Sequence, residues 1–211
     1  MGDDIGLWCE IGHVDWGQRP ALFLDRDGVI VADTGYLGCA EDLRMIDGVA
    51  STIARCNTLR IPVVVVTNQS GIARGYYDWD GFRAVQAALS AALATAGARL
   101  DAVLACAYHA EGSGPLRMDG HPWRKPNPGM IIAAGLGMNL DLSRSWIVGD
   151  RADDLAAGAA AGLAGGTLVA PDDGARQQAS LLAGPQFIVE TAANAADALA
   201  LLIDSGRLKH L

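Results

Sequence analysis

Short apolar runs alternate with helical patterns along most of the chain. The runs are rich in β-branched residues and bounded by turn residues, which is typical of buried strands; they cover residues 21–24, 62–67, 101–108, 145–149, 166–170 and 186–189. Between them, apolar residues recur at helical spacing and predict helices over residues 49–60, 79–96, 128–136, 153–161 and 195–204. Asp78 stands at the expected N-cap of the second helix.

This alternation predicts the fold class. Strands that alternate with helices form right-handed βαβ units, which build a mostly parallel sheet with helices on both faces. We therefore expect an α/β protein, a three-layer α/β/α sandwich with a Rossmann-like sheet, formed by residues 21–211 as a single domain. Residues 1–20 lie outside the alternation and are interpreted as an N-terminal extension of unknown role.

Composition argues against nucleic acid and membranes as partners. The 211 residues are 51% hydrophobic and carry a formal net charge of −8, which allows a sizeable core and disfavours binding to nucleic acid. The longest strongly apolar stretch, "IPVVVV", is too short to span a bilayer, and the N-terminus does not resemble a signal peptide. We expect a soluble cytoplasmic protein without a membrane partner. Its cysteines are expected to be free thiols: Cys9, Cys39, Cys56 and Cys106.

Polar clusters follow four of the predicted strands. They read "DRDG" (25–28), "TNQSGIARG" (67–75), "RKPNPG" (124–129) and "DRADD" (150–154). A single Asp at a strand end is more often a turn former or a helix cap. In an open α/β sheet, however, ligands bind beyond the carboxyl ends of the strands, and several acids gathered there repel one another unless a cation compensates them. The clusters together therefore predict a catalytic or metal site.

Four segments resemble the motifs of a known superfamily. In order and spacing, "LFLDRDGVI", "VVVTNQSGIARG", "RKPNPGM" and "IVGDRADD" are similar to the four motifs of the haloacid dehalogenase (HAD) superfamily of phosphotransferases. The phrases around them resemble one branch, the D-glycero-D-manno-heptose 1,7-bisphosphate phosphatases and the histidinol-phosphate phosphatases. The resemblance covers about residues 20–170 and implies a HAD-like fold. Because the loops are short, we expect no large cap domain.

The chemistry of phosphate ester hydrolysis suits the first cluster. Asp25 is the candidate nucleophile, which would form an aspartyl phosphate that water then attacks. Asp27 is placed to protonate the leaving oxygen and then to deprotonate water, and this second acid favours phosphoryl transfer over dehalogenation. Gly28 allows the chain to turn away where a side chain would crowd the site. Strand alternation predicts that Arg26 points to the opposite face, without a catalytic role.

A cation is expected beside these acids. Mg²⁺ prefers oxygen ligands, which suits the Asp25 carboxylate, the Asp27 backbone carbonyl and the Asp150 carboxylate. Asp153 and Asp154 are either supporting residues of this metal site or acids that favour the N-terminus of the following helix.

Lys125 and Thr67 complete the predicted catalytic set. Lys125 is one of only two lysines in the chain and would supply a compact positive charge to the phosphoryl oxygens, unless it is a surface residue. Thr67 would donate its hydroxyl to a phosphate oxygen, with a turn-capping role as the alternative.

The resemblance also implies a set of substrate contacts. These are Asp33, Thr34, Gly35, Tyr36, Asn68, Gln69, Ser70, Arg124 and Arg151. The planar fork of Arg124 suits a distal phosphate and favours a heptose bisphosphate as the substrate, with removal of its C7 phosphate. Histidinol phosphate or another small phosphate monoester is the alternative, and a catalytically silent sugar-phosphate-binding protein is a third interpretation. We expect a monomer or weak oligomer.

The loop 106–125 departs from the family pattern. Many relatives bind a structural zinc there, but the corresponding residues here are Cys106, Tyr108, His121 and Trp123. Cys106 is kept, His121 retains a ligating nitrogen, and His109 lies one residue out of register. A tetrahedral site needs four nitrogen or sulfur ligands, so we expect this loop to fold by packing and without zinc.

Overall fold

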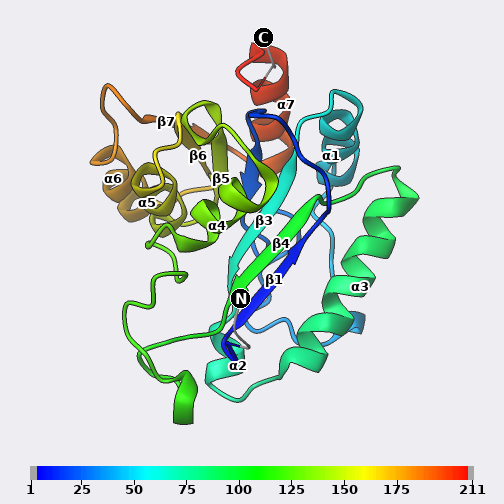
Figure 1. Ribbon diagram of the computed structural model, residues 1–211, viewed down its shortest axis with the longest axis vertical. Coiled ribbons are helices and arrows are strands. Elements are labelled where there is room, and N and C mark those ends of the chain that lie inside the picture. The colour runs from blue at the N-terminus through cyan, green and yellow to red at the C-terminus, as the bar shows by residue number, and fades with distance from the viewer. Residues whose placement is uncertain (1–3, 209–211) are drawn as a thin grey trace.

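A seven-stranded sheet with helices on both faces forms the protein, and the computed structural model describes residues 4–208 (Figure 1). The strand order is β1-β4-β3-β2-β5-β6-β7, with β1 antiparallel to β4 and every other pair parallel. The strands are β1 (Leu7–Ile11), β2 (Leu22–Leu24), β3 (Val63–Asn68), β4 (Ala102–Cys106), β5 (Trp146–Gly149), β6 (Gly165–Val169) and β7 (Ile188–Ala192). The predicted fold class is confirmed.

Three long helices cover each face of the sheet. One layer contains α1 (Val49–Thr58), α3 (Trp79–Thr95) and α7 (Ala195–Ser205), and the other contains α4 (Gly129–Met138), α5 (Ala152–Ala160) and α6 (Asp173–Ser180). A single turn, α2 (Ser70–Ala73), follows β3 directly. The five expected helices are present, whereas α2 and α6 were not expected. The Asp78 side chain caps α3 by accepting hydrogen bonds from the backbone of Asp80 and Gly81, as predicted.

The two-residue period of the strands divides the core into two layers. In β2, Leu22 and Leu24 face the α1, α3 and α7 layer, whereas Phe23 faces the opposite layer. All three side chains are buried, which explains why the run is continuously apolar. The chain can therefore place polar residues only where the strand ends, directly before Asp25.

The strand β1 was not foreseen from the sequence. It lies at the edge of the sheet, beside β4, with Leu7 opposite Cys106 and Ile11 opposite Ala102 (Figure 1). Its residues are only partly buried or exposed, so the segment lacks the apolar run by which the other strands are recognised. Trp8 anchors it through an edge contact with Phe82 of α3, at 5.4 Å between ring centroids.

None of the helices in the described part of the chain combines the length and apolar character needed to cross a bilayer. The two long loops that border the carboxyl ends of the strands, residues 25–48 and 107–128, contain one 3₁₀ turn each and isolated β-bridges, with no additional domain. The expectation that there is no large cap domain is therefore confirmed.

The packing of α3 generates a stability prediction. Leu89 is fully buried between α3 and the sheet, so Leu89→Ala should lower the free energy of unfolding by about 2 to 5 kcal/mol, through lost burial and a residual cavity. The neighbouring Ser90 is exposed, and Ser90→Ala should change the stability by less than about 0.5 kcal/mol. Urea denaturation measures both. A similar loss in the two variants would contradict the layer assignment.

Candidate active site

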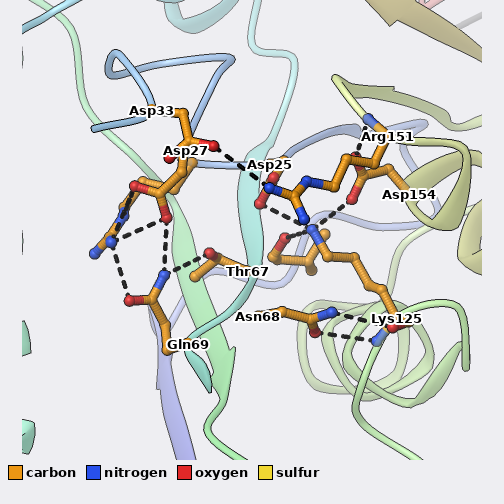
Figure 2. Close-up of polar contacts among 11 residues, drawn as sticks. Asp25, Asp27, Asp33, Thr67, Asn68, Gln69, Lys125, Arg151 and Asp154 are labelled. Carbon is orange, nitrogen blue, oxygen red and sulfur yellow. Dashed lines mark hydrogen bonds and ion pairs between the residues drawn. The ribbon is translucent and has the colours of Figure 1, made fainter. Parts of the chain in front are cut away.

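The carboxyl ends of β2, β3 and β5 open into a polar cavity of about 350 Å³. Sequence-predicted residues that line it are Asp25, Asp27, Asp33, Gly35, Tyr36, Asn68, Gln69, Ser70, Arg124, Lys125 and Arg151. Thr34, Thr67 and Asp150 are not among the lining residues, and Thr67 is hydrogen-bonded to the cavity residue Gln69 (Figure 2). The strand-end clusters that are distant in sequence are thus brought to one edge of the sheet.

Lys125 lies at the centre of the site with its ammonium buried. Its Nζ is 2.8 Å from Oδ1 of Asp25 and 2.6 Å from Oδ1 of Asp154, and it donates to the carbonyl of Val66 at 2.8 Å. Burial lowers the pKa of Lys125, but the carboxylates of Asp154 and Asp25 outweigh this effect and raise the pKa above its ordinary value. The side chain is therefore a permanent cation, not a surface residue.

The backbone of Lys125 is held by Asn68 at the end of β3. The Asn68 amide donates to the Lys125 carbonyl at 3.0 Å and accepts from the Lys125 N–H at 3.1 Å (Figure 2). These two contacts satisfy both backbone polar groups of Lys125 with one side chain. Asn68 thus orients the lysine, in addition to lying at the cavity.

Three carboxylates gather beside Lys125. Oxygens of Asp25, Asp150 and Asp154 all lie within 4.8 Å of one another. Burial, followed by the charges of Asp25 and Asp154, raises the pKa of Asp150 to about 7. Oδ1 of Asp150 is buried without a hydrogen-bond partner among the described residues. A buried carboxylate oxygen without a donor, next to two further carboxylates, fits a divalent cation.

Gly28 is required by the position of Asp150. Its φ of 79° lies in the left-handed region, and a Cβ at this position would lie 2.5 Å from Oδ2 of Asp150. A side chain at residue 28 would therefore displace the carboxylate, as the sequence analysis anticipated.

Asp154 fills the helix-capping role that the sequence left open and also pairs with Lys125, while its supporting role at a metal site stays a prediction. Its Oδ2 accepts the backbone N–H of Arg151 at 3.0 Å and so caps α5, while its Oδ1 binds Lys125. Asp153 faces the cavity instead. Arg151 extends over the cavity and contacts Asp33 at 3.4 Å (Figure 2).

The amide of Gln69 connects Asp27 to Thr67. Its Nε2 donates to Oδ2 of Asp27 at 3.0 Å and to Oγ1 of Thr67 at 2.8 Å. Its Oε1 accepts from Arg26 at 3.0 Å and from the Tyr77 hydroxyl at 2.6 Å. Because a guanidinium can only donate, the carbonyl of Gln69 must face Arg26 and the amide nitrogen must face Asp27. Gln69 is buried with every polar position used, so it positions Asp27 and Thr67.

This network corrects the expectation for Arg26. Strand β2 ends at Leu24, so strand alternation no longer applies, and the Arg26 side chain turns to bind Asp27, with 3.0 Å between Nη2 and Oδ2. Arg26 is fully buried over the ring of Phe82 and does not line the cavity. Burial raises the pKa of Asp27 above its ordinary value; the charge of Arg26 opposes this shift and that of Asp25 adds to it.

The sequence analysis missed several cavity residues, among them three with polar side chains. Arg74, Tyr77 and His109 line the cavity together with the predicted set. Nη2 of Arg74 lies 3.3 Å from Nε2 of His109 and 2.8 Å from a carboxylate oxygen of Glu111. Arg74 belongs to "TNQSGIARG", so a basic residue within a recognised motif was an available signal. His109 and Tyr77 gave none, because their loop conformations are not encoded in local periodicity.

The zinc candidates of the loop 106–125 are dispersed. Cys106 Sγ and His121 Nδ1 are 3.8 Å apart, but His109 is turned toward Arg74. The Tyr108 ring stacks on His121 with centroids 4.2 Å apart. The zinc-free fold of this loop remains a prediction, with aromatic packing available as its support.

The crowded acids generate a prediction about stability without metal. Asp150→Asn should raise the melting temperature of the EDTA-treated protein by a few degrees at pH 8, because a neutral amide relieves the repulsion from Asp25 and Asp154. An acid whose folded pKa is raised to about 7 destabilises the fold fully above that pH and progressively less toward pH 4. The gain should therefore shrink at pH 4.5.

Differential scanning fluorimetry with and without Mg²⁺ provides the control for this prediction. Mg²⁺ should raise the melting temperature of the wild type and have little effect on Asp150→Asn, because a bound ligand stabilises only the form that binds it. A variant that is less stable than the wild type in EDTA at pH 8 would contradict the repulsion argument.

Comparison with known sequences identifies relatives over most of the chain. A family model described as HAD-hydrolase-like matches residues 122–195. The D-glycero-beta-D-manno-heptose-1,7-bisphosphate 7-phosphatase of Mesorhizobium japonicum is 51% identical over 166 residues, which is 78% of this chain and 76% of the relative. The D-glycero-alpha-D-manno-heptose-1,7-bisphosphate 7-phosphatase of Burkholderia mallei is 42% identical over 75% of this chain and 84% of its own length.

Solved structures agree with these sequence matches. A HAD-like protein from Mesorhizobium loti superposes with a TM-score of 0.87 at 42% identity, covering 99% of this chain and 97% of its own. The D,D-heptose 1,7-bisphosphate phosphatase of B. bronchiseptica, solved with magnesium and phosphate, superposes with a TM-score of 0.74 at 32% identity, covering 88% and 99%. This chain therefore belongs to the heptose-1,7-bisphosphate 7-phosphatase family of the HAD superfamily of phosphatases.

Proposed function

We propose that this chain is a Mg²⁺-dependent phosphatase that removes the C7 phosphate of D-glycero-D-manno-heptose 1,7-bisphosphate through an aspartyl phosphate on Asp25. The observation that carries the proposal is the pairing of Asp25 with the buried cation of Lys125, at the same cavity that Asp27 faces. The naming of relatives up to 51% identical as 7-phosphatases of this sugar supports the choice of substrate.

The first step is attack of an Asp25 carboxylate oxygen on phosphorus. Lys125, whose Nζ is 2.8 Å from that carboxylate, balances negative charge on the phosphoryl oxygens as the ester bond breaks. The Thr67 hydroxyl oxygen already accepts from Gln69, which leaves its own proton free to donate to a phosphoryl oxygen. A bound Mg²⁺, held by Asp25, Asp150 and the Asp27 carbonyl, would neutralise further negative charge on the transferring group.

Asp27 transfers the protons of both steps. In its protonated form it donates to the leaving sugar oxygen, and the resulting carboxylate then takes a proton from the water that hydrolyses the aspartyl phosphate. The raised pKa of Asp27 favours the protonated form at the start of this cycle. The contacts from Gln69 and Arg26 hold the carboxyl group in one orientation throughout.

The cavity also suits a second anionic group. Arg74, Arg124 and Arg151 line it, and Arg124 has no carboxylate within ion-pair distance among residues 4–208. An unpaired guanidinium offers a planar pair of donors to a distal phosphate. These cations favour a bisphosphate over histidinol phosphate, whose amine is positively charged.

Loss of the nucleophile tests the reaction. Asp25→Asn should lower kcat for the bisphosphate by roughly three orders of magnitude or more, because an amide does not form the acyl phosphate. Phosphate release measures the activity, and far-UV circular dichroism checks the fold. Asp173→Asn, an exposed change on α6, serves as the control and should retain full activity. Substantial turnover by Asp25→Asn would exclude the proposed intermediate.

Removal of Arg124 tests the substrate class. Arg124→Ala should raise KM for the heptose bisphosphate roughly 10- to 100-fold, as expected for a lost charge-assisted hydrogen bond. The KM for p-nitrophenyl phosphate should stay within about twofold of the wild-type value. Arg117→Ala, an exposed change in the same loop, controls for the loss of a positive charge. Equal losses on both substrates would mean that Arg124 serves the reacting phosphate.

A further inference from the structure

The N-terminal edge strand extends its pairing into the loop that carries Arg124. Beyond the last pair of the ladder, Leu7 with Cys106, the N–H of Ala107 donates to the carbonyl of Gly6 at 2.8 Å. Figure 1 shows β1 running along β4 to the point where this loop begins. The first residues of the loop therefore take their position from a segment about a hundred residues earlier in the chain.

Tyr108 follows Ala107 directly, and its side chain packs against the same N-terminal segment. Its hydroxyl donates to Oδ1 of Asp4 at 2.6 Å, and the same oxygen accepts the N–H of Gly6 at 3.0 Å. The ring lies directly against Gly6, where a Cβ would overlap it, so the absence of a side chain at residue 6 is what admits the ring. Tyr108 is 7% exposed, although it belongs to an irregular loop.

Tyr108 in turn holds Arg124 by two routes. Its carbonyl accepts from Nη1 of Arg124 at 3.1 Å. Its ring stacks on His121, whose carbonyl accepts the Arg124 N–H at 2.9 Å and whose Nδ1 accepts the Trp123 N–H at 3.1 Å. Tyr108 thus contacts the guanidinium of Arg124 directly and supports the backbone of Arg124 through His121.

We propose that Asp4 and Gly6 are positioning residues, which fix Tyr108 and through it orient the Arg124 guanidinium toward the distal group of the substrate. The N-terminal segment would then be part of the substrate-recognition machinery. This inference rests on the proposed function in one respect, because Arg124 is assigned to the distal phosphate.

The hydrogen bond between the Tyr108 hydroxyl and Asp4 can be tested by substitution. Asp4→Ala and Tyr108→Phe each remove it, whereas Asp4→Asn keeps a carbonyl oxygen that can accept from both Tyr108 and Gly6. Glu10→Ala is the matched control, because Glu10 is an exposed acid of the neighbouring strand β1 and lies opposite Val103 of β4, not opposite the loop.

Steady-state kinetics with two substrates give the first test. Asp4→Ala and Tyr108→Phe should raise KM for the heptose bisphosphate roughly three- to tenfold with kcat nearly unchanged, and leave KM for p-nitrophenyl phosphate within twofold. Asp4→Asn should restore KM to near the wild-type value, and Glu10→Ala should not change it. Equal losses on both substrates, or no change on either, would overturn the proposal.

Hydrogen exchange gives a second test that is independent of activity. Amide exchange in the peptide covering residues 107–124 should be faster in Asp4→Ala and Tyr108→Phe than in the wild type, and unchanged in Glu10→Ala. Unchanged exchange in the two test variants would show that the N-terminal segment does not hold the loop.

The Arg124→Ala background separates this proposal from the proposed function. If Arg124→Ala raises KM for the bisphosphate and adding Asp4→Ala raises it no further, the two residues act in one chain of contacts. If Arg124→Ala has no effect on KM, the assignment of the distal phosphate fails. If Arg124→Ala raises KM for the bisphosphate and Asp4→Ala leaves it unchanged, only the positioning role of Asp4 fails.

Discussion

The buried ammonium of Lys125 is the interaction on which the rest of the site depends. A buried charge is costly unless partners compensate its lost hydration, and Asp25, Asp154 and the Val66 carbonyl do so within 2.8 Å. The same contacts join the end of β2, the first turn of α5 and the end of β3. They also offset repulsion among the clustered acids. The cation therefore links the geometry of the site to the packing of the sheet.

Two residues of the segment "TNQSGIARG" fix the orientation of the catalytic groups. Asn68 satisfies the backbone of Lys125, and Gln69 satisfies Asp27 and Thr67 with an amide whose orientation Arg26 dictates. Such a network restricts the reacting groups to one arrangement before substrate arrives. Fixed donors stabilise developing charge without reorganising during the reaction.

The loop that carries Arg124 and Lys125 is long and irregular, so its catalytic end must be tied to rigid elements. Lys125 is tied to β3 through Asn68, and Arg124 is tied to the edge of the sheet through Tyr108. Tyr108 uses its ring, hydroxyl and backbone carbonyl in separate contacts. A loop fixed at several points loses less conformational freedom when substrate binds.

The pattern of apolar and polar positions was enough to predict the α/β fold, six of the seven strands and the strand-end placement of Asp25, Asp27 and Asp150. It did so because buried parallel strands read as short apolar runs and polar residues directly after them must meet at one edge of the sheet. Only tertiary contacts account for the edge strand β1, the pairing of Arg26 with Asp27, the positioning role of Gln69 and the cavity residues Arg74, Tyr77 and His109. These features arise from contacts between residues far apart in the chain, or from loop backbone that departs from strand and helix periods, and neither is encoded in a local pattern of hydrophobic and polar positions.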